Sequence, residues 1–252
     1  MSVEAWAPLA GKAAVVTGGA RGIGAAIARL FAAAGARGAV LDLAAAADAP
    51  PGWTGVAADV GDEASLRSAF RRVEAELGAV DVLVAAAGIV PPWSRVDSLD
   101  LAEWDEVLAV NARGVAATLL HALPLMGEGG SVIAIASLNA WKGDPNLVAY
   151  TASKHAVVGV VRSAALDLGR RGIRVNALAP GPIATDALLD RMRRREAELG
   201  TPVEEALAAA AGETALGRIA TAEEVAGAAL FLASDLSSGV TGQLLPVDAG
   251  VR

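Results

Sequence analysis

Several residue types that build common active sites are missing or scarce in this chain of 252 residues. It has no cysteine, which excludes disulfides, thiolate metal sites and cysteine nucleophiles. Its only histidines, His121 and His155, are too few for a histidine-rich metal site, so we expect no metal. The formal net charge of -7 argues against nonspecific binding of nucleic acid. The chemistry of the protein must therefore come from other side chains.

Signals for membranes and export are also lacking. The long apolar segments carry charges, such as Arg162, Asp167 and Glu224, so no charge-free run is long enough to cross a bilayer. The first six residues have neither the basic nor the apolar region of a signal peptide. We expect a cytoplasmic globular protein that acts on a small molecule, with no nucleic-acid or membrane partner.

Tyrosine and lysine are scarce, yet one of each lies at helical spacing. Tyr150 is the only tyrosine, and Lys154, one of three lysines, follows four residues later. Positions four apart share one face of a helix. Free tyrosine titrates near pH ~10, and a nearby ammonium favours the phenolate and lowers that pKa. The pair predicts a general acid/base for a hydroxyl or carbonyl group, although the spacing alone also fits a solvated helix face.

Apolar residues are abundant, at 54%, and they form short runs that alternate with longer helical patterns. This alternation is typical of βαβ units and a parallel sheet. No internal repeat or linker divides the chain, so we expect one domain over residues 1–252. We expect strands at 13–16, 39–41, 55–58, 80–86, 132–136, 174–178 and 240–247, and helices at about 22–34, 63–77, 103–123 and 150–169.

One stretch departs from this alternation. Residues 185–218 have a helical pattern without a following strand, and they include the basic run Arg191–Arg195. The run is consistent with a solvated helix face, or with a site for an anionic carrier or substrate, which would favour a reductase of 3-oxoacyl thioesters. An insertion near the carboxyl edge of a parallel sheet is also where a substrate lid would lie, so we predict a lid at about 185–218.

A glycine-rich turn follows the first expected strand. Gly18, Gly22 and Gly24 stand where a helix begins, which lets the backbone approach a pyrophosphate at the positive end of the helix. Three residues separate Gly18 from Gly22, unlike the commoner G-x-G-x-x-G pattern, and a simple tight turn is the alternative.

Acidic residues after the next two strands indicate which nucleotide is bound. Asp42 is placed to accept hydrogen bonds from the adenosine ribose and to repel a 2′-phosphate, although an ordinary aspartate at a strand end is the alternative. Arg21 favours the opposite choice, since a guanidinium pairs with a 2′-phosphate. We predict NAD, with NADP second. Asp59 is a candidate for the adenine amine, or for a helix N-cap.

These motifs together resemble the short-chain dehydrogenase/reductase family in its single-domain form. The resemblance rests on Thr17-Gly-x-x-x-Gly22-Ile23-Gly24, Ser137, Tyr150-x-x-x-Lys154 and Pro180-Gly181, and it extends from Lys12 to Asp248. It implies an α/β fold of Rossmann type, with a doubly wound parallel sheet and helices on both faces. It also implies a homotetramer or homodimer built on the two long helices.

The resemblance implies a role for each matching residue. Tyr150 would be the proton donor and acceptor, Lys154 would lower its pKa and hold the nicotinamide ribose, and Ser137 would bind the substrate oxygen. Asn111 would position a water in the proton relay. The cofactor-binding positions are Gly18, Arg21, Gly22, Ile23, Gly24, Asp42, Asp59, Val60, Ala87, Gly88, Tyr150, Lys154, Pro180, Gly181, Ile183 and Thr185. The chain departs from the family at Ala85-Ala86-Ala87-Gly88, where Asn-Asn-Ala-Gly is common.

The substrate pocket is expected to be mainly apolar. Its candidate residues are Trp93, Leu138, Asn139, Trp141 and Leu147, with interface packing as the alternative for the two tryptophans. We predict an oxidoreductase that transfers hydride between NAD(H) and an apolar or cyclic secondary alcohol or ketone. The alternatives are an NADPH-dependent 3-oxoacyl-thioester reductase, a catalytically idle dinucleotide-binding protein, and an epimerase or dehydratase.

Overall fold

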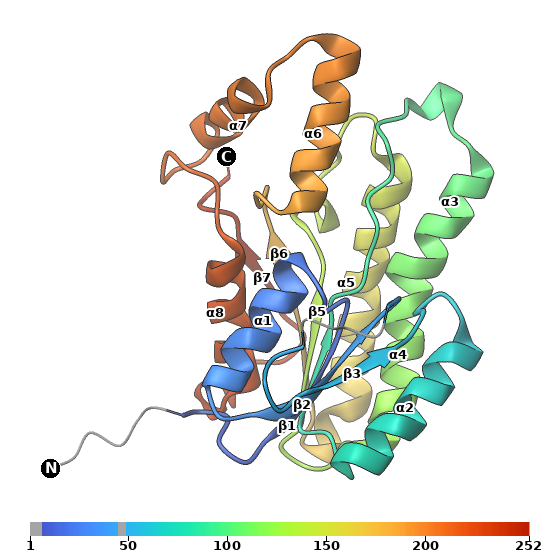
Figure 1. Ribbon diagram of the computed structural model, residues 1–252, viewed down its shortest axis with the longest axis vertical. Helices are drawn as coiled ribbons and strands as arrows, with labels where there is room; N and C mark the ends of the chain where they lie inside the picture. The colour runs from blue at the N-terminus through green and yellow to red at the C-terminus, as the bar shows by residue number, and fades with distance from the viewer. Residues whose placement is uncertain (1–6, 45–48, 252) are drawn as a thin grey trace, which may run out of the picture.

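A seven-stranded parallel sheet forms the centre of the molecule (Figure 1). The computed structural model describes residues 7–44 and 49–251, so the first six residues lie outside it. The strand order β3-β2-β1-β4-β5-β6-β7 confirms the doubly wound prediction. The strands are β1 (Ala13–Thr17), β2 (Arg37–Asp42), β3 (Thr54–Ala57), β4 (Val82–Ala85), β5 (Ser131–Ile135), β6 (Arg174–Pro180) and β7 (Leu244–Val247).

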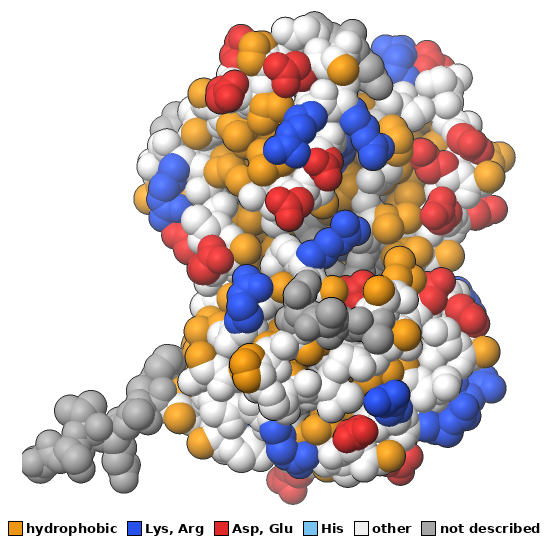
Figure 2. Space-filling model, viewed as in Figure 1, with side chains coloured by type: hydrophobic (Ala, Val, Ile, Leu, Met, Phe, Trp, Pro, Cys, Tyr) orange, Lys and Arg blue, Asp and Glu red, His pale blue; other side chains and the backbone are white. Residues whose placement is uncertain are grey.

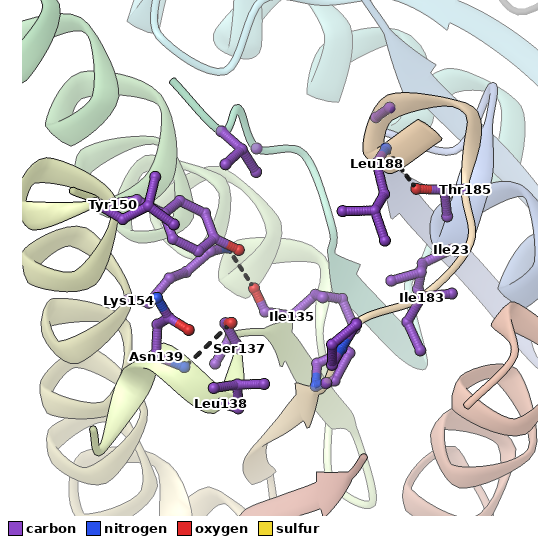
Figure 3. A pocket seen from close by; sticks show the side chains of 18 of the residues that line it. Ile23, Ile135, Ser137, Leu138, Asn139, Tyr150, Lys154, Ile183, Thr185 and Leu188 are labelled. Atoms are coloured by element: carbon purple, nitrogen blue, oxygen red, sulfur yellow. Dashed lines mark hydrogen bonds between the residues drawn. The ribbon is translucent and has the colours of Figure 1, made fainter. Parts of the chain in front are cut away.

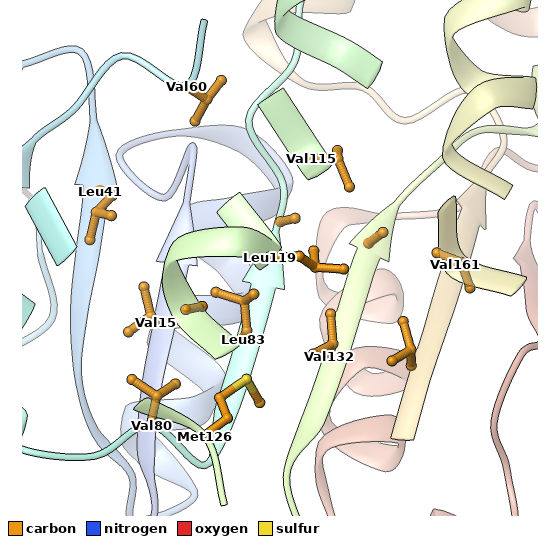
Figure 4. Packing of buried hydrophobic residues seen from close by; sticks show 14 of the residues in the cluster. Val15, Leu41, Val60, Val80, Leu83, Val115, Leu119, Met126, Val132 and Val161 are labelled. Carbon is orange, nitrogen blue, oxygen red and sulfur yellow. The ribbon is translucent and has the colours of Figure 1, made fainter. Parts of the chain in front are cut away.

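Helices cover both faces of the sheet (Figure 1). One layer contains α1 (Gly22–Ala33) and α8 (Ala222–Ala233), and the other contains α2 (Glu63–Leu77), α3 (Leu101–Leu108), α4 (Gly114–Ala122) and α5 (Val148–Leu168). Successive strand residues point to opposite faces. Val15 therefore packs under the α2–α4–α5 layer and Val16 under the α1–α8 layer. Figure 4 shows Val15, Leu83 and Val132 from three neighbouring strands facing Leu119 and Val161 of the helices.

Two helical features were not expected from the sequence. The predicted helix at 103–123 is divided, because a π-helical turn spans Ala109–Arg113 between α3 and α4. Helix α8 was missed, although its start carries the signature S/T-x-x-E of a capping box. The Thr221 hydroxyl accepts from the Glu224 amide at 3.2 Å, and the Glu224 carboxylate accepts from the Thr221 amide at 2.9 Å.

The last strand is shorter than the predicted 240–247. It begins at Leu244, because the chain before it turns at Gly242, whose φ of 71° lies in the left-handed region. Strand β4 likewise covers Val82–Ala85 instead of 80–86.

Among the described residues, one helical run, Leu101–Leu125, is long and apolar enough to cross a membrane by composition. It comprises α3, the π-helical turn and α4, and 44% of its most apolar window is buried inside the protein. A helix layer packed on a sheet core has this composition for structural reasons, so we read it as a core element.

Two helices stand beyond the carboxyl ends of the strands, at the top of Figure 1. They are α6 (Asp186–Leu199) and α7 (Val203–Gly212), and they lie within the predicted insertion. In Figure 2 the upper part of the molecule, which contains these two helices, carries charges of both signs interspersed on the face in view. Parallel sheets of this order bind ligands at the carboxyl edge where the strand order reverses, here between β1 and β4.

Candidate active site

The turn after β1 is packed so closely that only glycine fits. Gly18 has φ 64°, and a Cβ atom there would lie 2.6 Å from the Ala87 Cα. A Cβ atom on Gly24 would overlap the Gly18 carbonyl oxygen. Helix α1 begins at Gly22, and the side chain of its N-cap residue, Arg21, does not cap it. The turn therefore presents uncapped backbone N–H groups at a helix N-terminus, an arrangement that fits a pyrophosphate.

Thr17 joins this turn to the end of β4. Its hydroxyl oxygen accepts from the amides of Ala86 and Ala87, at 3.2 and 3.4 Å. Thr17 thus links β1 to the Ala85-Ala86-Ala87-Gly88 segment after β4, in which the common family pattern has two asparagines.

Asp42, at the end of β2, contacts the same turn. Its Oδ2 accepts from the Ala20 amide at 3.0 Å, and its Oδ1 accepts from the Leu43 amide at 2.8 Å. A carboxylate has about four acceptor positions. Asp42 can therefore hold the turn and still accept from a ribose, so the two interpretations of this residue are compatible.

Asp59 does not cap a helix. Its Oδ1 accepts from the Gly61 amide at 2.8 Å, and the N-cap of α2 is Asp62, which accepts from Ala64 at 2.9 Å. That alternative for Asp59 is corrected, and the exposed carboxylate remains a candidate for the adenine amine. Val60 is buried in the core.

A cavity of about 320 Å³ opens beside the turn. Figure 3 shows Ser137, Tyr150 and Lys154 on one side of it, and Ile23, Ile183, Thr185 and Leu188 on the other. The first group comes from the end of β5 and from α5, and most of the second comes from the segment after β6. Residues distant in sequence thus enclose one site.

The Tyr150–Lys154 pair is confirmed as a shared helix face. The Lys154 Nζ lies 5.6 Å from the centroid of the Tyr150 ring and donates to the Ile135 carbonyl at 2.9 Å. Lys154 is only 5% exposed, and burial lowers its pKa to about 8.

The pKa of Tyr150 differs from the sequence expectation. Burial raises this pKa, and it outweighs the hydrogen bond with Ser137 and the positive charge of Arg191, which lower it. Lys154 turns its ammonium to the Ile135 carbonyl, so the lysine is not what offsets the burial of the phenol.

Ser137 lies at the base of the cavity, where β5 ends. It is buried, and its hydroxyl oxygen accepts from the Asn139 amide at 3.2 Å as the cap of a short 3-10 turn, Leu138–Ala140. The Asn139 side chain donates to the Asp144 carboxylate at 3.2 Å and to the Thr151 hydroxyl at 3.3 Å. These bonds tie the serine turn to the start of α5 and so hold Ser137 near Tyr150.

Asn111 lies in the π-helical turn and is fully buried. Its Oδ1 accepts from the Ile89 amide at 2.8 Å, and its Nδ2 donates to the Ile89 carbonyl at 2.8 Å and to the Ser153 hydroxyl at 3.1 Å. Both amide hydrogens are therefore used, and a relay water would have to meet an acceptor of Asn111. Single π turns are frequent at functional sites.

The other predicted cofactor positions lie along the same edge of the sheet. A Cβ atom on Gly88 would lie 3.1 Å from the Asn111 Oδ1 and 3.6 Å from the Lys154 Nζ. Pro180 ends β6, and a Cβ atom on Gly181 would lie 2.8 Å from the Asp248 Cβ. Thr185 caps α6, its Oγ1 accepting from the Leu188 amide at 3.4 Å.

Of the predicted substrate residues, Leu138, Asn139 and Leu147 line the cavity and the two tryptophans do not. Trp141 directly follows the serine turn, is 45% exposed and is not among the residues that line the cavity. Trp93 contacts a lining residue, because the Arg191 Cζ lies 4.6 Å from its ring centroid.

Sequence reasoning indicated Arg191 only as part of a basic run, and it missed other lining residues, among them Asp144, Leu188 and Met192. The signal for Leu188 and Met192 was the helical period of the 185–218 insertion, which places them on one face with Arg191. The histidines stay outside the cavity lining, and no group of three His, Cys, Asp or Glu side chains gathers in the part of the chain that the structure describes.

Comparisons with known proteins agree with this geometry. A family model described as Enoyl-(Acyl carrier protein) reductase matches residues 18–252. A Mentha piperita protein, (-)-isopiperitenol/(-)-carveol dehydrogenase, mitochondrial, is 41% identical, over 97% of this chain and 94% of its own length. The cis-4-hydroxycyclohexanecarboxylate dehydrogenase of Sinomonas cyclohexanicum is 40% identical, over 95% and 96% of the two chains.

The chain belongs to the short-chain dehydrogenase/reductase family. The structure of levodione reductase superposes with a TM-score of 0.89 and 32% identity, covering 96% of this chain and 97% of that one. The protein is therefore an oxidoreductase that acts on CH–OH groups, in a family that uses nicotinamide dinucleotides. The packing of Gly18, Gly22 and Gly24 fits such a coenzyme.

Proposed function

We propose that this enzyme interconverts a cyclic, largely apolar secondary alcohol and its ketone, with NAD(H) as coenzyme. The observation that carries the proposal is the cavity, where a tyrosine and a serine face a wall of aliphatic side chains. Three relatives support the substrate class, because the names of two dehydrogenases and one reductase refer to cyclic compounds.

The proton transfer is assigned to Tyr150 and the binding of the reacting oxygen to Ser137. In oxidation the Tyr150 phenolate takes the hydroxyl proton of the substrate, and in reduction the phenol returns it to the carbonyl oxygen. The Ser137 hydroxyl donates to the same oxygen and stabilises negative charge there. When bound, the nicotinamide supplies or accepts the hydride. Lys154 and Asn111 hold the coenzyme ribose and the relay water.

Replacement of Tyr150 by phenylalanine tests this assignment. Tyr150→Phe keeps the ring and removes the hydroxyl, so we expect turnover to fall by roughly 10²–10⁴-fold. Affinity for NADH should stay within about twofold, as measured by fluorescence titration. Unimpaired turnover of a panel of cyclic alcohols by this variant would remove the central claim. Tight NADH binding without any turnover by the wild type would favour an idle dinucleotide-binding protein.

The choice of NAD is assigned to Asp42, and the relevant experiment compares NADH and NADPH titrations. We expect the wild type to bind NADH more tightly, because the carboxylate repels a 2′-phosphate. Asp42→Asn should reduce the ratio of the affinity for NADH to the affinity for NADPH. Asp59→Asn is the matched control, because the adenine is common to both coenzymes and both affinities should fall together. A preference for NADPH would show that Arg21 governs the choice.

A reductase of 3-oxoacyl thioesters is the second candidate. The description of the matching family refers to an acyl carrier protein, and α6 exposes Arg193 and Arg194, although Arg193 pairs with Asp190 at 2.7 Å. Tighter NADPH binding together with turnover of a 3-oxoacyl thioester would establish this activity in place of the first.

The remaining parts of the proposal concern the lid, the assembly and the location. Residues 185–218 act as a substrate lid, supported by the four residues of α6 that line the cavity. The protein forms a homotetramer or homodimer, supported by the exposed Leu120 of α4 and Leu166 of α5, and light scattering measures this directly. We place the enzyme in the cytoplasm, which fractionation of the source cells checks.

A further inference from the structure

Three charged side chains line the cavity, and they come from three different places. Lys154 lies on the α5 wall and donates to the Ile135 carbonyl. Asp144 lies beside the serine turn and accepts from the Asn139 side chain. Arg191 lies on α6, within the predicted lid. Lys154 and Asp144 are hydrogen-bonded to residues beside Ser137 and Tyr150. Arg191 is therefore the charged side chain that the predicted lid brings to the cavity.

The guanidinium of Arg191 is oriented by an aromatic ring. Its Cζ lies 4.6 Å from the centroid of Trp93, within the range of a cation–π contact. A guanidinium carries its N–H donors in one plane, and this planar fork matches a carboxylate. Trp93, which the sequence indicated as a wall of the pocket, thus acts on the cavity through its contact with Arg191.

Arg191 also acts across the cavity on the catalytic tyrosine. Its positive charge is one of the causes that lower the pKa of Tyr150, against the effect of burial. A substrate whose carbinol carbon lies at Tyr150 occupies the cavity that Arg191 also lines. The side chains of Leu188 and Ile183 on the same side of the cavity are aliphatic and suit a ring.

We propose that Arg191 binds a carboxylate on the substrate, so that the enzyme acts on alicyclic hydroxy acids and oxo acids in which a ring separates the carbinol from the carboxylate. This inference rests on the proposed function and narrows its substrate class. The cavity favours a monoanion over a phosphate dianion, because Asp144 shares the lining and repels added negative charge.

The test is a ratio of kcat/KM values for two substrates that differ only in charge. The substrates are 4-hydroxycyclohexanecarboxylate and its methyl ester, and the proteins are the wild type, Arg191→Met, Arg191→Lys and Arg194→Met. Arg194 lies on the same helix and is exposed, so it is the matched control. The effect of Arg191 on the Tyr150 phenol is common to both substrates and cancels in the ratio.

We expect the wild type to prefer the carboxylate and Arg191→Met to lower the ratio by about 10–100-fold, the value of a hydrogen-bonded charge pair. Arg191→Lys should recover part of the ratio, and Arg194→Met should leave it unchanged. An equal loss for both substrates in Arg191→Met would overturn the inference, because Arg191 would then act only on the tyrosine or on packing.

Failure of the proposed function gives a different pattern. If the wild type oxidises neutral cyclohexanols without preferring the carboxylate, the proposed function holds and the carboxylate site is refuted. If no cyclic alcohol reacts, binding of cyclohexanecarboxylate to the NADH-loaded protein still decides the inference by calorimetry. Binding that Arg191→Met abolishes would support the site, and equal binding by both proteins, or none, would refute it.

Discussion

The phosphate turn and the proposed lid, residues 185–218, both border the cavity, and they are built in opposite ways. Around the turn, helix α1 buries six of its twelve residues, and glycines stand where backbone atoms pack too closely for a Cβ atom. In the lid, α7 buries none of its ten residues, and Gly200 and Gly212 have no neighbour within 4 Å of a built Cβ atom.

The contrast follows from what each of the two binds. A pyrophosphate is the same in every turnover and is held by backbone N–H groups, so its site needs a rigid main chain. A substrate is distinguished by side chains, and a segment that acts as a lid, as we propose for residues 185–218, has to be less tightly packed. We therefore expect the tightly packed turn and α1 to bind the part of the coenzyme common to the family. We expect the less tightly packed segment 185–218 to determine substrate specificity.

The largest test of this contrast is a pair of glycine substitutions. Gly24→Ala forces a Cβ atom against the Gly18 carbonyl oxygen, a backbone atom that has little room to move. We expect a destabilisation at or above the ~1–3 kcal/mol typical of overpacking, and loss of NADH binding. Gly212→Ala, at the end of α7, should change neither property. Thermal melts and NADH titrations measure both properties. Equal losses in Gly24→Ala and Gly212→Ala would contradict the difference in packing between the turn and the proposed lid.

The second test concerns the buried charge of Lys154. The pKa of Lys154 falls from 10.5 to about 8, so between these values the unfolded chain holds a proton that the native protein has lost. The cost of burying the ammonium is therefore present in full below pH ~8 and disappears as the pH rises towards 10.5.

Lys154→Met should therefore make the protein more stable at pH ~7 while abolishing turnover. The gain is about 3 kcal/mol at 1.36 kcal/mol per pKa unit, less about 1 kcal/mol for the lost bond to the Ile135 carbonyl. Urea unfolding at pH ~7 and pH ~10 measures the difference in the free energy of unfolding between the variant and the wild type, and this difference should be smaller at pH ~10. A variant that is less stable than the wild type at both pH values would contradict this prediction.

The third test uses the pH dependence of turnover to measure how Arg191, in the proposed lid, changes the pKa of Tyr150. Oxidation needs the Tyr150 phenolate, and burial raises the pKa of Tyr150, so kcat/KM for a neutral alcohol should rise with pH well above 7. The charge of Arg191 lowers this pKa, and Arg191→Met should therefore move the rising limb to higher pH. Arg194→Met is the control and should leave the pH profile unchanged. An unshifted profile in Arg191→Met as well would contradict an effect of the Arg191 charge on Tyr150.

The smallest test compares two helix caps, each worth about 1 kcal/mol. Thr221→Ala removes the cap of α8, whose buried residues include Val225 and Leu232, so the free energy of unfolding of the whole protein should fall. Thr185→Ala removes the cap of α6 and should free the amides of that helix for hydrogen exchange while the melting temperature changes little. Equal changes in melting temperature would mean that the lid unfolds together with the body.

The sequence by itself determined the parallel α/β fold, the phosphate turn and the Tyr150–Lys154 pair. These features depend on local rules, such as the period of apolar residues, the need for glycine in a close turn and the spacing of four residues on a helix. The extent of the last strand and the existence of α8 were less well predicted. Both depend on turn and capping chemistry, at Gly242 and Thr221, which period alone does not reveal.

Only the tertiary structure decided which side chains meet in the cavity and how their charges act. It placed Arg191 on Trp93 and inside the cavity wall, ninety-eight positions apart in sequence, and it left Trp141 outside. It also turned Lys154 to a carbonyl of β5, so that burial raises the pKa of Tyr150 where spacing alone predicted a decrease. Burial and long-range contact have no local pattern, because they arise from segments that the fold brings together.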